Sequence, residues 1–218
     1  MRRLLAFFSL LAALSLVGCA APTKSTDYTS FKASRPRSIL VLPPINESPD
    51  VHATYGLLSQ VTFPLAESGY YVLPVALVDE TFRQNGLTTP SDIQSLPPQK
   101  LRDIFGADAA LYMTVSEYGS KYQVVQSSAT VQAAAKLVDL KTGDTLWTGS
   151  ARASSSDGNN NSGGGILGML ISAALTQIIN SATDASFGMA GVAANRLLLA
   201  GPPAGILYGP RSPKYQSD

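Results

Sequence analysis

The sequence has almost none of the side chains that build metal and thiol centres. It contains one cysteine, Cys19, and one histidine, His52, among 218 residues. A zinc site needs several cysteine, histidine or carboxylate ligands, so a histidine-based or cysteine-based cluster is excluded. No G-x-S-x-G motif accompanies His52, and a serine nucleophile needs a base held beside it. These absences predict a protein that is not an enzyme and carries no cofactor, with His52 an ordinary residue beside a loop.

The sequence also lacks an excess of charge of either sign. It has 16 lysines and arginines against 15 aspartates and glutamates. Nucleic-acid binding needs clustered basic residues, so no nucleic-acid partner is predicted. The stretch GGGILG at residues 163–168 fits G-x-G-x-x-G. A dinucleotide site needs a strand before that motif and an acidic residue on a following strand. Here a polar loop precedes the motif, so no nucleotide is expected.

No apolar run is long enough to remain in a bilayer. Residues 4–17 are apolar apart from two serines, and they follow the positively charged Arg2 and Arg3. A membrane-spanning helix needs about 20 apolar residues. A charged start, a shorter apolar stretch and small residues at its end are typical of a secretory signal peptide. Residues 1–18 are therefore predicted to be a signal peptide that takes no part in the fold.

The single cysteine lies directly behind this run. The residues Leu16-Val17-Gly18-Cys19 resemble the bacterial lipobox. The resemblance implies diacylglycerol on the Cys19 sulfur, cleavage before Cys19 and acylation of the new amino terminus. Several acyl chains together make a lasting anchor, whereas one holds a protein only marginally. The residue after Cys19 is Ala20 and not aspartate, which resembles the sorting pattern of outer-membrane lipoproteins. The predicted location is therefore the outer membrane, on its periplasmic face or at the cell surface. The alternative is an ordinary cleaved signal with an incidental cysteine.

The rest of the chain is divided by composition. Residues 19–37 show little apolar periodicity and are predicted to be a lipidated, flexible tether. A single globular domain is predicted over 38–200, with a Gly/Asn/Ser loop at 154–165. The tail at 201–218 contains several prolines and is expected to be irregular. Roughly 160 ordered residues suffice for one domain of ordinary size.

Apolar patterns predict the elements of that domain. In the first half, short apolar runs alternate with segments whose apolar residues have helical spacing. The runs predict strands at 38–42 and 70–75, and the spaced segments predict helices at 54–68, 77–85 and 97–105. A kink is expected at Pro64 and a loop at 88–95. After residue 110 three segments with a period of two predict an antiparallel meander, and a helix is expected at 185–199. The predicted fold is α/β (α+β), a single mixed sheet with two N-terminal β-α units, a three-stranded antiparallel meander and C-terminal helices.

Two sets of residues are candidates for a contact surface. Residues 166–182 carry no charge, and a helix apolar nearly all round must be buried. It can pack on the sheet, against another copy or a partner protein, or at a membrane. Tyrosines in or beside the predicted strands either pack on the sheet or form a recognition surface. The candidate interface residues are Leu170, Ile171, Ile178, Ile179, Tyr118 and Tyr122.

Three stretches carry a family resemblance. They are GYYVLPVALVDETFRQNGLTTPSDI (69–93), FGADAALYMTVSEYGSKY (105–122) and LVDLKTGDTLWTG (137–149). They resemble a bacterial lipoprotein family typified by a meningococcal genome-derived surface antigen. The resemblance implies a fold similar to the TolB amino-terminal domain and a non-enzymatic role in the envelope. Members are often encoded beside a CsgG-like lipoprotein, which implies that lipoprotein as a partner. The D-x-x-T-G-x-x-L-W-x-G pattern is expected to be a hairpin with a packed Trp147.

The sequence thus leads to two functional hypotheses. The first is a lipid-anchored outer-membrane lipoprotein that is a non-catalytic component of an envelope or secretion-related complex, assembled with itself or with a CsgG-like lipoprotein. The second is an accessory binding protein that regulates peptidoglycan synthesis or serves a transporter. The second hypothesis predicts a defined pocket or the direct capture of a synthase or a small ligand.

Overall fold

The computed structural model describes residues 26–122, 127–157, 185–201 and 204–217. Several predicted features lie outside these residues. They are the signal peptide, Cys19, the side chain of Tyr122, most of the Gly/Asn/Ser loop, and the uncharged segment with Leu170, Ile171, Ile178 and Ile179. Within the described residues no helix is both long and apolar enough to cross a membrane.

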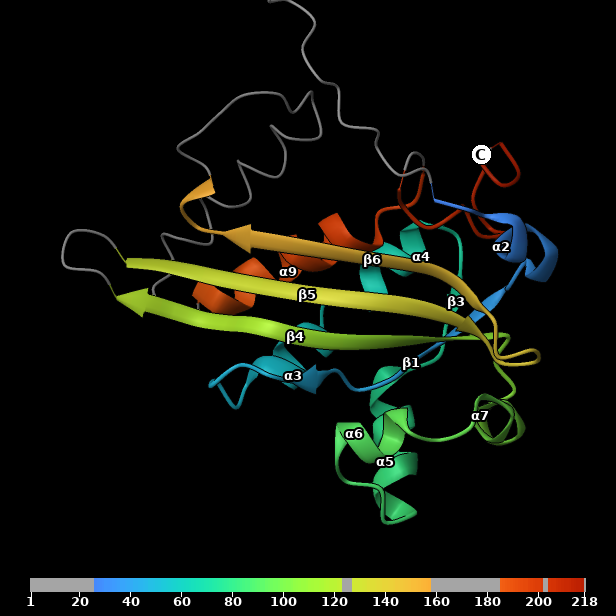
Figure 1. Cartoon of the computed structure of the whole chain (residues 1–218), viewed down its shortest axis with the longest axis horizontal. Coiled ribbons are helices and arrows are strands. Elements are labelled where there is room, and N and C mark those ends of the chain that lie inside the picture. The colour runs from blue at the N-terminus through green and yellow to red at the C-terminus, as the bar shows by residue number, and fades with distance from the viewer. Residues whose placement is uncertain (1–25, 123–126, 158–184, 202–203, 218) are drawn as a thin grey trace, which may run out of the picture.

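A six-stranded mixed sheet forms the centre of the domain, in the order β3-β1-β4-β5-β6, with β2 also paired to β4 (Figure 1). The strands are β1 (Ser38–Val41), β2 (Ile45–Asn46), β3 (Tyr71–Val72), β4 (Ala109–Tyr122), β5 (Ser127–Asp139) and β6 (Thr145–Ser154). Strands β3, β1 and β2 run parallel to their partners, whereas β4, β5 and β6 form an antiparallel meander. The predicted α/β fold with a single mixed sheet is confirmed.

Helices cover both faces of the sheet, because the buried strands carry apolar side chains on both sides. On β4, Leu111 and Met113 belong to one core cluster, whereas Ala110 and Tyr112 belong to the other. The first cluster includes side chains of α3 (Ala53–Leu58), α4 (Thr62–Glu67) and α9 (Ala185–Leu198). The second includes side chains of α5 (Val75–Gln84), α6 (Pro90–Gln94) and α7 (Pro98–Phe105). Figure 1 shows α9 behind the meander and α5, α6 and α7 together below it.

The helix predicted over 54–68 is two helices. Helix α3 ends at Leu58, and α4 begins at Thr62, so that Pro64 lies in the first turn of α4. A proline inside a helix lacks the N–H for the i→i−4 bond and clashes with the carbonyl four residues earlier, but it is tolerated in a first turn. The break therefore comes before the proline, and not as a kink at it.

Helix α6 lies in the segment predicted as a loop at 88–95. Thr89 is its N-cap, and its Oγ1 accepts a hydrogen bond from the Asp92 backbone N–H at 3.3 Å. The Thr89 hydroxyl also donates to Asp92 Oδ2 at 2.6 Å. Pro90 occupies the first helical position, where its missing N–H costs nothing. Start signals of this kind are sufficient for a short helix even where apolar periodicity is weak.

The segment predicted as a flexible tether contains an ordered helix, α2 (Thr29–Ser34). Phe31 of α2 is only 3 % exposed and belongs to the larger core cluster. The Ser34 hydroxyl donates a hydrogen bond to Asp139 Oδ2 at the end of β5. One aromatic anchor and one partly buried hydrogen bond hold this helix against the domain, and neither produces a periodic pattern. The folded part consequently begins before residue 38.

The C-terminal tail is irregular in backbone but packed into the domain. Ile206 is fully buried and Leu207 nearly so. The Gly209 N–H donates to Ser68 O at 2.8 Å, and the Arg211 N–H donates to Gly69 O at 3.0 Å. The tail therefore runs beside the segment that leads into β3 and helps to close the larger core.

Candidate functional site

The D-x-x-T-G-x-x-L-W-x-G pattern forms the turn between β5 and β6. Asp139 Oδ1 accepts the backbone N–H groups of Lys141 at 2.7 Å and Thr142 at 2.9 Å. Gly143 has a φ of 82°, which glycine adopts without strain. Burial raises the pKa of Asp139, but the hydrogen bonds from Ser34, Thr142 and Lys141 outweigh it and hold that pKa below its ordinary value. The aspartate is thus an ionised turn residue.

The second half of the pattern fixes Trp147. Its ring lies over Gly149, where a Cβ would overlap with the indole, and its Nε1–H donates to Ala204 O at 2.8 Å. Trp147 is 2 % exposed. The predicted hairpin with a packed tryptophan is confirmed, and this pattern builds the fold and holds the tail.

Tyr118, a candidate interface residue, lies in the core. It is 6 % exposed, and its ring lies over Gly56 of α3, where a Cβ would overlap with the phenol. This position supports the packing interpretation for Tyr118 and removes its ring from any contact surface. Tyr118 lies on the face of β4 that packs on α3, α4 and α9, together with Leu111 and Met113, because the register shifts between Val115 and Glu117.

His52 precedes α3 and is exposed, with its backbone N–H bonded to Asp50 Oδ1 at 2.9 Å. Across the described parts of the chain, no three histidine, cysteine or carboxylate side chains group closely enough to hold a metal ion. The charged groups that do meet form ion pairs, among them Arg196 with Asp157 at 2.9 Å and Arg83 with Asp79 at 3.0 Å. These contacts are structural.

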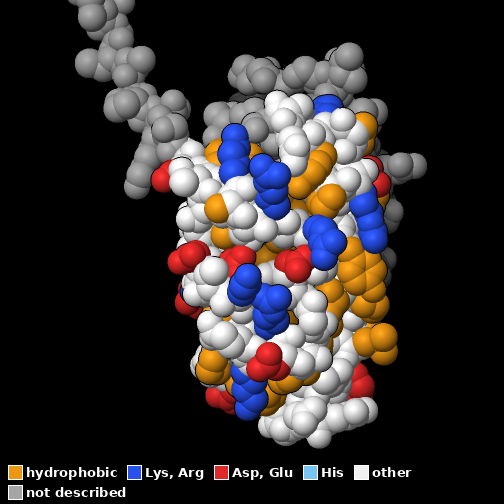
Figure 2. Space-filling view, turned by 90° about the vertical axis from the view of Figure 1, so that its right-hand side faces the viewer, with side chains coloured by type: hydrophobic (Ala, Val, Ile, Leu, Met, Phe, Trp, Pro, Cys, Tyr) orange, Lys and Arg blue, Asp and Glu red, His pale blue; other side chains and the backbone are white. Residues whose placement is uncertain are grey.

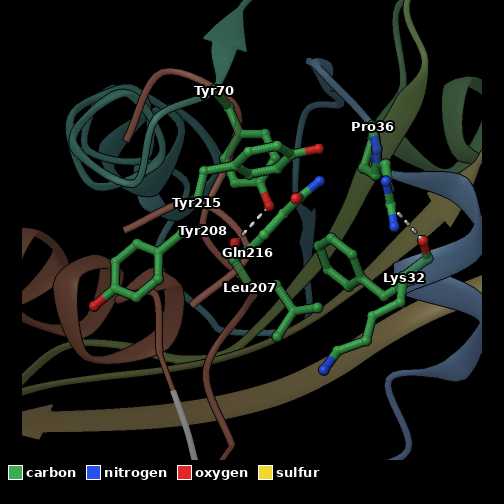
Figure 3. A pocket seen from close by; sticks show the side chains of 9 residues that line it. Lys32, Pro36, Tyr70, Leu207, Tyr208, Tyr215 and Gln216 are labelled. Atoms are coloured by element: carbon green, nitrogen blue, oxygen red, sulfur yellow. Dashed lines mark hydrogen bonds between the residues drawn. The ribbon is translucent and has the colours of Figure 1, made fainter. Parts of the chain in front are cut away.

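A pocket of about 300 Å³ lies between α2 and the C-terminal tail. Figure 3 shows the rings of Tyr70, Tyr208 and Tyr215 on one side and Lys32 on the other. The Tyr70 hydroxyl donates to Leu207 O, which fixes that ring at the base of the tail. The residues that line the pocket are Phe31, Lys32, Arg35, Pro36, Tyr70, Leu207, Tyr208, Tyr215 and Gln216.

The lining of this pocket is aromatic and positively charged. Lys32 comes from α2 and Arg35 is the residue that caps its C-terminal end. Just outside the pocket, Lys214 Nζ lies 5.4 Å from the Tyr208 ring centroid. None of the lining side chains is acidic. A cation over an aromatic face is held by the ring quadrupole. The pocket therefore suits a group that is negatively charged and partly apolar.

Comparison with known proteins assigns the chain to a family. A profile of the family described as "Putative lipoprotein GNA1162-like" matches residues 26–211. The chain is also 52 % identical over 203 residues to "Putative lipoprotein NMB1124/NMB1162" of Neisseria meningitidis serogroup B, covering 93 % of this chain and 94 % of that protein. The chain belongs to the GNA1162-like lipoprotein family.

One solved structure agrees with this assignment. The crystal structure of lipoprotein GNA1162 from Neisseria meningitidis is 55 % identical, covers 67 % of this chain and 100 % of that chain, and superposes with a TM-score of 0.54. The LpoB C-terminal domain from Salmonella enterica is 19 % identical over 53 % of this chain and 81 % of that chain, with a TM-score of 0.38. The resemblance to this lipoprotein family that three sequence stretches indicated is confirmed.

The backbone of this GNA1162-like lipoprotein takes an unfavourable conformation at two pocket residues. Arg35 has a φ of 45° and Gln216 a φ of 62°, and among the described residues no others apart from glycines have positive φ. Both line the pocket. Left-handed backbone costs an L-residue about 1–2 kcal/mol, and such residues concentrate at binding sites. At the end of a helix glycine is the usual choice for this conformation, so the Arg35 side chain is retained at a cost in stability.

Replacing Arg35 with glycine is expected to stabilise the domain. The change removes the left-handed strain and should raise the free energy of unfolding by about 0.5–1 kcal/mol. Urea unfolding followed by circular dichroism measures it. Arg35→Ala is the matched control, because it removes the same guanidinium but keeps a Cβ at a φ of 45°. Equal stability of the two variants would contradict the strain.

Sequence reasoning missed most of the pocket. Of its lining residues, only Tyr70 lies in a predicted strand, because the others fall in the segments predicted as tether and tail. A signal is present in both segments. Tyr28 and Phe31 are aromatic residues in an otherwise polar stretch, and Ile206-Leu207-Tyr208 is an apolar run inside the tail. Flexible linkers rarely carry such residues.

Proposed function

We propose that this chain is a lipid-anchored outer-membrane lipoprotein that acts without catalysis as a component of an envelope or secretion-related complex. The observation that carries the anchor is the lipobox-like Leu16–Cys19 stretch in a chain that belongs to a lipoprotein family. The α2–tail pocket, which is lined by tyrosines and cations, supports a role in binding an anionic group.

The surface proposed for association combines residues 166–182 with the helix that follows them. Residues 166–182 carry no charge. On α9, Phe187 is 44 % exposed although most of that helix is buried. An aromatic side chain left half-exposed beside an uncharged stretch favours protein–protein contact. The proposed partner is a second copy or a CsgG-like lipoprotein.

Cys19→Ala tests the anchor. The variant cannot accept diacylglycerol, so after a high-salt wash, which screens attraction between surface charges and lipid headgroups, it should leave the membrane fraction or keep an uncleaved signal. Several acyl chains would have kept the parent anchored under the same wash. Membrane fractionation and the mass of the purified chain report both outcomes. Ser15→Ala, four residues earlier in the same apolar run, is the control and should fractionate as the parent does. A Cys19→Ala chain found processed in the outer membrane would disprove lipid attachment there.

Charged substitutions test the association surface. Leu170→Glu together with Ile178→Glu should abolish the complex recovered in mild detergent, because a buried contact cannot accept two unpaired carboxylates. Thr176→Glu is the matched control, since it adds a charge at one of the polar positions, Ser172, Thr176 and Asn180, that recur every four residues in the same segment. Chemical cross-linking and native mass spectrometry measure the complex, and circular dichroism checks the fold. A double variant that folds and associates as the parent does would rule out this surface.

A further inference from the structure

The chain enters the domain at the same end where it leaves. The Tyr28 hydroxyl donates to Gly205 O, which joins the segment before α2 to the tail. Figure 1 shows α2 and the C-terminus together at one end, away from the far ends of β4 and β5. Thr26 follows Cys19 by only seven positions, a stretch of chain that spans at most about 25 Å. If Cys19 carries lipid, as the proposed function holds, this end of the domain stays close to the bilayer.

This end of the domain also carries exposed cations. Arg35, Arg211 and Lys214 are exposed, and none has an acidic partner among the described residues. The Arg211 guanidinium lies over the ring of Tyr71, with its Cζ 5.3 Å from the ring centroid. Figure 2, which views this end directly, shows Lys and Arg side chains on its upper part and further ones below a row of Asp and Glu. The near-neutral chain therefore has Lys32, Arg35, Arg211 and Lys214 exposed beside its tether, together with the exposed carboxylate of Asp27.

We propose that this α2–tail surface, made of Lys32, Arg35, Tyr208, Arg211, Lys214 and Tyr215, docks on an anionic phospholipid membrane. Two observations select this occupant, the short tether that ends beside the surface and the charge that complements anionic headgroups. Each lysine or arginine near such a membrane contributes about 1 kcal/mol of attraction, and tyrosine favours the membrane–water interface. The pocket between Arg35 and Tyr215 receives a lipid phosphate, and the rings border its apolar part.

This docking accounts for the strained backbone of the pocket. Arg35 and Gln216 both hold left-handed conformations beside the opening. In that conformation Arg35 ends α2 and still presents a guanidinium, and its Nε–H donates to Lys32 O at 3.0 Å. A glycine would relieve the strain but would remove the charge. Arg35 therefore lowers the stability of the domain, but it holds a positive charge in a fixed place beside the membrane.

The test uses the chain from residue 20 onward, which lacks the lipid and keeps every described residue. Its binding to vesicles of phosphatidylcholine with phosphatidylglycerol is compared with binding to vesicles of phosphatidylcholine alone, by co-sedimentation at about 0.1 M salt, where the Debye length is about 10 Å. The parent should co-sediment with the anionic vesicles, and the bound fraction should fall as the salt concentration rises. Arg35→Gln with Lys214→Gln should weaken binding about thirtyfold, since two cations are removed.

Matched controls keep the result specific. Lys100→Gln with Lys136→Gln removes the same charge from α7 and from β5, and should retain nearly full binding. Hydrogen exchange of the parent chain with anionic vesicles should protect residues 28–36 and 205–216 above the rest. Equal loss in the two double variants, protection centred on another surface, or binding no stronger than to phosphatidylcholine alone would each overturn the docking. The Cys19→Ala fractionation is independent of all three, so failure here leaves lipid anchoring standing.

Discussion

Replacing Trp147 with alanine is expected to lower the free energy of unfolding by about 4 kcal/mol, within the usual range for a large aromatic in a core. The indole is 2 % exposed and stands opposite Leu137 in the β5–β6 ladder. Its removal leaves a cavity and releases Ala204 O from its hydrogen bond. Because Ala204 belongs to the tail, the variant should also loosen that segment. Urea unfolding measures the loss, and hydrogen exchange measures the tail.

A second substitution tests whether packing of the Trp147 ring on Gly149 contributes to stability. Gly149→Ala forces the indole to move, because the new Cβ overlaps with the ring. Overpacking of this kind costs about 1–3 kcal/mol. In the Trp147→Ala background the ring is gone, so Gly149→Ala should be nearly neutral there. A double-mutant cycle that shows simple additivity would mean that the two residues do not interact.

Gly69→Ala should destabilise the domain by about 3 kcal/mol or more, because two penalties add. Gly69 has a φ of 96°, which disfavours any side chain. A Cβ there would also overlap with Ser212 N and stand 2.8 Å from Gly209 O, both backbone atoms of the docked tail. Backbone cannot rotate away as a flexible side chain can. The tail must therefore separate from residues 68–70, and the pocket must open.

Gly86→Ala is the matched control for this change. Gly86 has a φ of 79°, but a Cβ added there would have no atom within 4 Å. The free energy of unfolding of this variant should fall only by the cost of the left-handed backbone, about 1–2 kcal/mol. The difference between the two variants isolates the close approach of the tail. Thermal unfolding gives both values, and limited proteolysis of residues 204–217 should accelerate only in Gly69→Ala. Equal losses would show that the tail does not press on Gly69.

The elements that the sequence predicts well are those with a local signal. The meander follows from alternation, since Leu111 and Met113 face one core and their neighbours face the other side. Helix α7 follows from Pro98 at its start and Gly106, whose φ of 66° ends it. In each case the residues that determine the structure lie within a few positions of one another.

The elements that escaped prediction depend on distant partners. Helix α2 is held by Phe31 in a core built from later strands and by the Ser34 bond to Asp139, more than a hundred residues away. The tail is ordered by backbone bonds from Gly209 and Arg211 to residues 68 and 69. Neither segment has the period of a helix or strand. The pocket lies between these two segments. Because neither segment has a pattern that predicts order, the pocket could not be predicted either.

The bond between Tyr28 and Gly205 has a practical consequence for labelling. Since it brings the entering and leaving chain together, a label on the tail lies beside the segment that leads toward Cys19. In the proposed docking, a fluorophore there would report contact with the membrane surface and would compete with it for space. The far ends of β4 and β5 lie at the opposite end of the domain (Figure 1), so a probe placed there would lie away from the proposed docking surface.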